Sequence, residues 1–176
     1  MFKLHPRLQN DTMMLGRLPL CRVLLMNDAH YPWLILVPER PHLREIHELD
    51  ENDLPQLWRE SAFVARQLQQ GLEADKINIA ALGNVVAQLH VHHIARYVND
   101  VAWPAAVFGR DDAVPYTAAY LDALLPRLRE LLCASLDPRL KMHWRPALKT
   151  RQPSAANRRG TPASPAGPDS PATPAG

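Results

Sequence analysis

Residues 88–96 read Gln-Leu-His-Val-His-His-Ile-Ala-Arg, which places three histidines within four positions of an otherwise apolar run. Side chains alternate between the two faces of a β-strand, so Gln88, His90 and His92 would share one face. His93 would then point to the opposite face. Imidazole is the side chain best suited to proton transfer or nucleophilic attack near neutral pH. The stretch therefore predicts a strand that carries a reactive histidine pair.

Apolar runs on the N-terminal side of this stretch predict a first β-hairpin. Residues 20–26 and 33–37 are the two strand candidates, and the linker 27–32 between them has hairpin length. Continuous apolar runs of this kind indicate strands that are covered on both faces. Residues 2–16, by contrast, are polar and are predicted to be turn-rich.

A helix and a second hairpin are predicted next. Residues 50–74 repeat apolar side chains at helical spacing, and Asp50 can cap the N-terminal end of this helix. The apolar period then changes to that of a strand over residues 76–81. Gly83-Asn84 is a turn signal, and residues 85–97 form the returning strand that contains the histidines.

The order of these elements predicts an α+β domain with an antiparallel sheet built from two hairpins and a crossing helix. Leucines at helical spacing predict a further helix over 117–136, which Pro126 would kink or split. We therefore expect a folded domain in residues 1–110 and a helical extension in 111–145. Residues 146–176 are rich in Pro, Ala and Ser and are expected to be disordered.

The size and hydropathy of the chain indicate one domain that is not embedded in a membrane. At 176 residues the chain fits a single domain. Its longest apolar stretches, such as residues 33–37, are too short to span a bilayer. The first residues lack the apolar core of a signal peptide, so a cytoplasmic location is expected.

The charge balance gives no indication of a nucleic-acid-binding surface. Of the 20 basic and 18 acidic side chains, five basic groups and one acid lie in residues 145–176. Residues 1–144 therefore hold 15 basic and 17 acidic groups and carry a net charge of −2. A nearly neutral body predicts no extended surface for nucleic acid.

A metal site is one possible role for the histidine pair. A His-x-His pattern such as His90 and His92 occurs in zinc and iron sites, which need three or four ligands. The nearest following carboxylate is Asp100, however, and Cys21 and Cys133 form no close-spaced ligand pair. Each cysteine is expected to be a small buried hydrophobe instead.

Phosphate chemistry is another role that these residues can support. An imidazole on a rigid strand can attack phosphorus and form a covalent phosphoramidate. The reaction needs the second ring nitrogen to be held by an acceptor, often a backbone carbonyl, and needs donors aimed at the phosphate oxygens. The neighbouring imidazole and the amides of the Gly83-Asn84 turn are candidates for those donors.

The stretch resembles the motif of the histidine triad (HIT) family, His-φ-His-φ-His-φ-φ, in which φ is apolar, with Gln88 in place of the first histidine. The resemblance extends over roughly residues 15–109. Met26-Asn27-Asp28 and Leu36-Val37-Pro38 match the ends of the family's first hairpin. Lys76-Ile77-Asn78 and Gly83-Asn84 match the strand and the glycine turn before the histidines.

The resemblance implies a role for each matching residue. His90 corresponds to the nucleophile, and His92 to the histidine that contacts phosphate and assists the leaving group. Asn27 and Asp28 correspond to positions that hold the nucleotide ribose. Further implied substrate-binding residues on the phosphate side are Asn78, Asn84 and Gln88.

Three other places in the sequence depart from the family pattern or carry no predicted contact with the substrate. Tyr31-Pro32-Trp33 stands where many members have Pro-Gly-His. Arg96 follows the motif as in many members, and it is expected to be a solvated strand end. His93 replaces an apolar residue and is expected to serve packing or a dimer contact.

The implied activity is that of a nucleotide-binding hydrolase or nucleotidyl transferase. It would act on the α-phosphate of a nucleotide conjugate, such as a dinucleoside polyphosphate or a nucleoside phosphoramidate, through a covalent nucleotidyl-His90 intermediate. The resemblance implies a homodimer and no metal or cofactor. Two alternatives stay open: a nucleotide-binding module with little or no turnover, and a metal-dependent enzyme that uses His90 and His92 as ligands.

Overall fold

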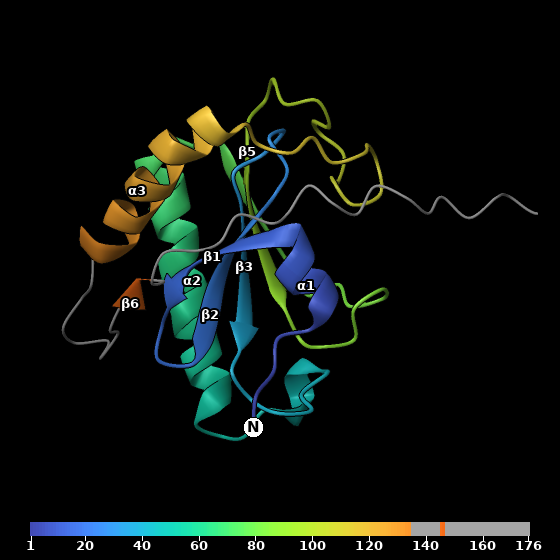
Figure 1. Ribbon diagram of the computed structural model, residues 1–176. Coiled ribbons are helices and arrows are strands. Elements are labelled where there is room, and N and C mark those ends of the chain that lie inside the picture. Colours follow the sequence, from blue (N-terminus) through green and yellow to red (C-terminus); the bar gives the residue numbers. More distant parts are fainter. Residues whose placement is uncertain (135–144, 147–176) are drawn as a thin grey trace, which may run out of the picture.

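The computed structural model of the chain describes residues 1–134 and 145–146 (Figure 1). Its elements in chain order are α1 (Pro6–Asp11), β1 (Thr12–Arg17), β2 (Cys21–Met26), β3 (Trp33–Pro38), the 3₁₀ helix η1 (Ile46–Glu48), α2 (Asp53–Gly71), β4 (Lys76–Ala80), β5 (Val91–Arg96), α3 (Ala118–Ala134) and β6 (Arg145–Pro146).

One six-stranded antiparallel sheet joins the two hairpins, with strand order β4-β5-β3-β2-β1-β6. The hairpins meet where β5 pairs with β3, and this register places Trp33 opposite Ile94 and Ile35 opposite His92. The histidine strand therefore lies inside the sheet, between β4 and β3, where both of its edges are hydrogen-bonded.

Two apolar clusters cover the two faces of this sheet. On one face, α2 and α3 pack together over the strands, as Figure 1 shows. Leucines of α2 and α3 join Val23, Leu34 and Val91 there in the larger core cluster. On the other face, the N-terminal segment and the segments before and after β5 form a second cluster around Trp33 and Ile35. Burial on both faces explains the continuous apolar runs of β2 and β3.

The structure confirms the predicted α+β fold with an antiparallel sheet and a crossing helix. Helix α2 begins at Asp53, slightly later than expected, and the Asp50 carboxylate accepts hydrogen bonds from the backbone N–H groups of Asn52 (2.9 Å) and Asp53 (2.8 Å). Asp50 thus satisfies amides that lack partners within the first turn, as its position in the sequence indicates.

Three expectations about local structure are corrected. The segment 2–16, expected to be turn-rich, contains α1 and most of strand β1, because Leu8, Met13 and Leu15 are buried and supply a core-facing side. The strand expected over 85–97 is shorter: β5 begins at Val91, and residues 81–90 form an irregular connection instead of a tight turn.

Helix α3 is one continuous element from Ala118 to Ala134 and contains Pro126, so Pro126 does not split it. Residues Arg145 and Pro146 form a short strand against Arg17 and Gly16 of β1. Disorder is expected for residues 146–176. Of these, residues 147–176 lie outside the part of the chain that the structure describes.

Candidate active site

His90 and His92 lie side by side where the irregular connection enters β5. Their ring centroids are 4.7 Å apart and the rings meet edge to face at 79°. The alternation predicted for the motif therefore places the two imidazoles on one face of the sheet. Strand pairing on both sides of β5 makes their support rigid.

The backbone fixes the orientation of the His90 ring. Nδ1 of His90 lies 2.7 Å from the carbonyl oxygen of Gln88. A carbonyl can only accept, so Nδ1 carries the proton and donates, and Nε2 of the neutral ring keeps a free lone pair. Burial lowers the pKa of His90. The hydrogen bond to the Gln88 carbonyl partly opposes this decrease, and nearby His5 adds to it. A neutral imidazole with an unprotonated Nε2 is the form that a nucleophile needs.

The His92 ring is fixed by a side chain from another strand. The indole Nε1–H of Trp33 on β3 donates to Nδ1 of His92 over 3.0 Å. The neutral ring of His92 therefore carries its proton on Nε2, which is the opposite tautomer from that of His90. Burial is the main cause that lowers the pKa of His92 to about 3, and the neighbouring His90 also lowers it, whereas a hydrogen bond to the backbone of Leu82 opposes the effect.

Apolar side chains cover the histidine pair. His90 is 5 % exposed and His92 is 7 % exposed. The His92 ring contacts the rings of Trp33 (5.3 Å between centroids) and Phe108 (5.1 Å). The surrounding cluster includes Leu4 and Leu8 from the N-terminal segment, and Val86 from the connection before β5. The two imidazoles are therefore almost completely shielded from solvent.

Gln88 binds the N-terminal segment. Its side-chain Oε1 accepts from the backbone N–H of His5 (2.9 Å), and its Nε2 donates to the carbonyl of Lys3 (3.0 Å). The amide thus uses one acceptor and one donor to hold a segment more than 80 positions away in the sequence. Gln88 connects the cover to the histidine pair, because its own carbonyl also accepts from His90.

The predicted ribose-side residues, Asn27 and Asp28, hold the segment before α3. Asn27 Oδ1 accepts from the backbone N–H of Tyr116 (3.1 Å). Asp28 Oδ1 lies 2.8 Å from His30 Nδ1 and accepts from the N–H of Val114 (3.3 Å). Both side chains therefore lie in the connection between β2 and β3 and hold residues 114–116 by hydrogen bonds to their backbone.

Asn78 and Arg96 form a buried network beyond the histidines on the same face. The Arg96 guanidinium donates to Asn78 Oδ1 (2.7 Å), to the Ala105 carbonyl (3.0 Å) and, through Nε and Nη2, to both carboxylate oxygens of Asp100. Arg96 is 1 % exposed. The expected solvated strand end is therefore wrong: the cation is buried because Asp100 and two further acceptors surround it.

Asn84 lies on the exposed part of the connection before β5. Among the described residues no hydrogen bond joins its side chain to the histidine pair. The structure thus brings together His90, His92 and the backbone of Gln88. The side chains of Asn27, Asp28 and Asn78 form hydrogen bonds with other residues instead of with the histidine pair.

His93 points to the opposite face, as strand alternation predicts, and packs against α2. Its Nε2 lies 2.7 Å from the Ser61 hydroxyl and its Nδ1 lies 3.1 Å from the carbonyl of Val91. Nδ1 therefore donates and Nε2 accepts from Ser61. Burial lowers the pKa of His93 to about 4, although the bond to Val91 opposes the effect. The hydrogen bond between Ser61 and His93 thus joins α2 to the face of β5 opposite to His92.

Sequence reasoning missed two residues of this arrangement, Trp33 and Ser61. The sequence marks Trp33 only as part of a departure from the family pattern, although its place at the start of the second strand is a signal that it lies near the site. Ser61 interrupts the apolar stripe of the predicted helix, and a polar residue on a buried stripe indicates a buried partner.

Within residues 1–134 and 145–146, no group of three or more His, Cys, Asp or Glu side chains is placed to hold a metal ion. Cys21 is buried as expected, but Cys133 is exposed. None of the helices in the described part of the chain is both long and apolar enough to cross a bilayer.

The sequence profile of the HIT domain family matches residues 7–99 of the chain. A search of curated proteins found none that matches. Among solved structures, a histidine triad protein from Marinobacter aquaeolei VT8 is 47% identical, covers 75% of this chain and 96% of its own, and superposes with a TM-score of 0.74. A histidine triad protein from Bradyrhizobium japonicum is 46% identical over 74% of this chain and 98% of its own, with a TM-score of 0.72.

A more distant protein extends the same likeness to the fold alone. It is a hypothetical histidine triad nucleotide-binding protein from Sulfolobus tokodaii strain7, 19% identical over 66% of this chain and 83% of its own, with a TM-score of 0.51. The paired imidazoles on an inner strand, the sheet order and the profile match all agree, and we conclude that this chain belongs to the histidine triad (HIT) domain family.

Proposed function

We propose that this protein is a nucleotide-binding hydrolase or nucleotidyl transferase in which His90 attacks the α-phosphate of a nucleotide conjugate. The observation that carries the proposal is the hydrogen bond from His90 Nδ1 to the Gln88 carbonyl, which leaves Nε2 as an unprotonated nucleophile. The histidine triad nucleotide-binding protein from Sulfolobus tokodaii supports nucleotide as the ligand by its description.

The reaction proceeds in two displacements. The Nε2 lone pair of His90 forms a bond to the α-phosphorus, and the bond from that phosphorus to the leaving group breaks. Water then attacks the nucleotidyl-His90 intermediate, the phosphorus–nitrogen bond breaks, and the mononucleotide is released; an alcohol or phosphate acceptor would make the same step a transfer. The Nε2–H of His92, whose ring lies beside that of His90, donates to an oxygen of the phosphoryl group.

The substrate-binding roles of the polar residues belong to the same proposal. Asn27 and Asp28 would define the ribose side by holding residues 114–116. Asn78 would define the phosphate side through Arg96, and exposed Asn84 would donate its amide directly. Gln88 would contribute by keeping the N-terminal segment against the bound nucleotide.

We include a homodimer in the proposal. Strand β4 forms one edge of the sheet, and apolar side chains of Ile79, Leu82 and Val85 are exposed on and just beyond it. An open strand edge next to exposed apolar side chains is suited to pairing with a second copy.

Trapping the intermediate tests the proposal. The parent protein, incubated briefly with a nucleotide conjugate labelled at the α-phosphate, is expected to retain acid-labile label. His90→Ala should retain none and lose activity by roughly 10³-fold or more, while its circular dichroism is unchanged. Undiminished turnover in His90→Ala would remove the mechanism.

A binding module with little turnover is the second candidate, and Gln88 favours it. Both polar ends of the Gln88 amide are engaged by the N-terminal segment, which lies over a pair that is 5 % and 7 % exposed. If neither the parent nor Gln88→His takes up label although both bind nucleotide, the binding module is the better description.

A further inference from the structure

The N-terminal segment, residues 1–5, is attached to the rest of the domain at two points. Both polar ends of the Gln88 amide bind its backbone, over 2.9 and 3.0 Å. Nearer its start, the guanidinium of Arg22 on β2 lies over the ring of Phe2, 4.8 Å from the ring centroid. Between these two points Leu4 is buried in the cluster that covers the histidine pair. The segment therefore follows a defined path as part of that cover.

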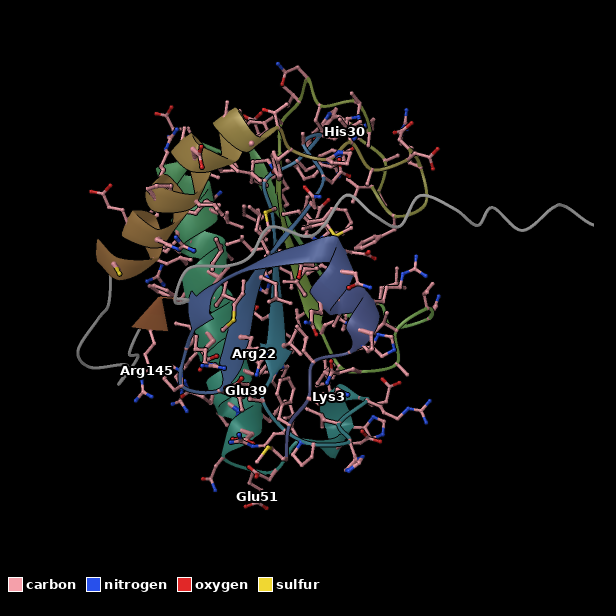
Figure 2. All side chains as sticks on the ribbon, viewed as in Figure 1. Lys3, Arg22, His30, Glu39, Glu51 and Arg145 are labelled. Atoms are coloured by element: carbon pink, nitrogen blue, oxygen red, sulfur yellow. The ribbon has the colours of Figure 1, made fainter. Side chains whose placement is uncertain are left out.

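A cavity of about 360 Å³ lies between this segment and the turn of residues 41–44. Met1 and Lys3 of the segment line it, together with the turn and Gln88. Figure 2 shows Lys3 beside this turn. The volume is at the lower end of the range for small-molecule sites, so the cavity suits a small ligand.

The charges that line the cavity are positive. Lys3 comes from the N-terminal segment and Arg44 from the turn, and His42 adds an imidazole that can donate a hydrogen bond. None of the described residues that line the cavity is acidic. Within residues 1–134 and 145–146, neither Lys3 nor Arg44 forms an ion pair. Two cations that line one cavity repel each other, and an anion bound between them removes this repulsion.

Three carboxylates around this turn are bound by other groups. Glu39 and Asp53 each accept from arginine side chains that do not line the cavity. Glu48 accepts from the backbone N–H groups of Arg44 (2.7 Å) and Glu45 (3.0 Å). None of the three lines the cavity, so its positive charge is not neutralised from within its walls.

The backbone of the turn is held in place. Leu43 is buried, and its carbonyl accepts from the N–H of Leu89 (3.0 Å), just before the histidine strand. His42 has a φ of 59°, a left-handed conformation that costs energy for a residue other than glycine. Such a conformation persists where the surroundings fix it, and it recurs at ligand-binding and switch sites. The side chains of His42 and Arg44, on either side of Leu43, therefore start from a fixed backbone at the cavity.

Gln88 connects the cavity to the histidine pair. Its side chain lines the cavity and donates to the carbonyl of Lys3, whereas its own carbonyl accepts from Nδ1 of His90 (2.7 Å). A ligand that draws Lys3 toward Arg44 acts on the backbone that Gln88 binds. It therefore tightens the cover over His90, which is 5 % exposed.

A tetrahedral oxyanion with two negative charges matches these donors best. Its several oxygens can accept from the guanidinium fork of Arg44 and from the ammonium of Lys3 at the same time, and His42 can donate to a further oxygen. A halide ion has no such set of separate acceptors.

We propose that this cavity is a regulatory anion site, separate from the nucleophile, that binds a small oxyanion of the phosphate type between Lys3 and Arg44 and clamps the N-terminal segment over the histidine pair. Hydrogen bonds and charge hold the ligand, and no covalent bond forms or breaks there. Binding is independent of the proposed reaction, whereas the inhibition that follows from slower entry of substrate rests on the proposed function.

Titration of nitrogen-15-labelled protein with inorganic phosphate at constant ionic strength tests the site. The amide signals of Lys3, Leu43 and Arg44 should shift and saturate in the parent protein, and chloride should not reproduce the shifts. His90→Ala should bind phosphate with the affinity of the parent. The double variant Lys3→Gln with Arg44→Gln should bind it about tenfold more weakly or worse.

The matched control for the double variant is Arg59→Gln. It removes an exposed cation from α2 and should leave the affinity for phosphate unchanged. A loss of affinity in His90→Ala, with none in the double variant, would place phosphate at the histidines and overturn the site. Shifts that chloride reproduces would overturn it as well.

A second ligand distinguishes the two sources of such an oxyanion. If free phosphate is the ligand, it should bind about tenfold more tightly than glycerol phosphate, which has lost one oxygen to the ester. If the phosphoryl group of a larger molecule is the ligand, glycerol phosphate should bind at least as tightly. Failure of both to bind would overturn the proposal.

Hydrogen exchange measures the clamp. Saturating phosphate should slow exchange of the His5 amide, which donates to Gln88, about tenfold in the parent and not in the double variant, with exchange in α2 unchanged. The same phosphate should lower kcat/KM for a nucleotide conjugate in the parent. The double variant should be fully active without phosphate and resistant to this inhibition. Unchanged exchange at saturating phosphate would overturn the clamp.

The results separate this inference from the proposed function. If His90 takes up no label but phosphate binds and slows exchange at His5, the proposed function fails and the anion site stands. If His90 is labelled and phosphate inhibits the parent and the double variant equally, the inhibition occurs at the histidines. The proposed function then stands and the inference is wrong.

Discussion

At the scale of single residues, three histidines in one short stretch have three different environments. His90 donates to a backbone carbonyl, His92 accepts from an indole, and His93 accepts from a hydroxyl on the far face. Each ring is held in a defined protonation state by a partner of fixed donor or acceptor character. The function proposed for each histidine follows from its partner and not from its position in the motif alone.

Removing the partner of His93 should cost stability rather than activity. Ser61→Ala leaves His93 Nε2 buried without a donor, because His93 is fully buried, and we expect the free energy of unfolding to fall by about 1–3 kcal/mol. Urea denaturation measures the change. The double variant Ser61→Ala with His93→Leu removes both polar groups and should recover most of the loss, whereas a loss in Ser61→Ala below about 0.5 kcal/mol would contradict the account.

At the scale of elements, irregular segments and the short helix α1 form the cover over the histidine face. The N-terminal segment is attached through Gln88, and residues 97–105 are attached through the ion pair of Arg96 with Asp100. Helices α2 and α3 occupy the other face, where they pack on the larger core (Figure 1). The cover over the histidine face is thus attached by a few polar contacts, which can open without unfolding the core.

Gln88→Ala should loosen the N-terminal segment selectively. The variant removes two hydrogen bonds, to His5 and Lys3, and we expect a loss of about 1 kcal/mol, since each bond is partly solvated. Hydrogen exchange should increase at residues 3–8 and stay the same in α2. The matched control is Gln70→Ala on the exposed side of α2; similar exchange in both variants would show that Gln88 does not hold the segment.

At the scale of the whole molecule, the buried histidines couple stability to pH. In the folded protein the pKa of His93 is about 4 and that of His92 about 3, both below the ordinary value of 6.5, because burial disfavours the charged ring. Between these values and 6.5 the unfolded chain binds more protons than the folded one. Stability therefore rises with pH across this window and is lost as pH falls from 6.5 to about 3.

The pH effect can be measured for His93 separately. A decrease in pKa from 6.5 to about 4 corresponds to about 3 kcal/mol of stability that is present above pH 6.5 and absent below pH 4. Urea denaturation of the parent at several pH values should show this slope, and the double variant Ser61→Ala with His93→Leu should show a flatter one. Parallel pH profiles for the two proteins would disprove the linkage to His93.

Local pattern in the sequence determined the order of the helices and strands, the shared face of His90 and His92, and the cap at Asp50, because each depends on neighbours a few positions away. It missed α1 and β1 in residues 2–16. The apolar pattern there is too short to predict a strand by itself, and β1 forms because it pairs with β2 in the folded sheet. The tertiary structure alone decided the partners that set the chemistry. Trp33 meets His92 across 59 positions, and the N-terminal segment meets Gln88 across more than 80. Such contacts follow from strand register and from burial of the whole apolar surface, which a periodic pattern along one segment does not encode.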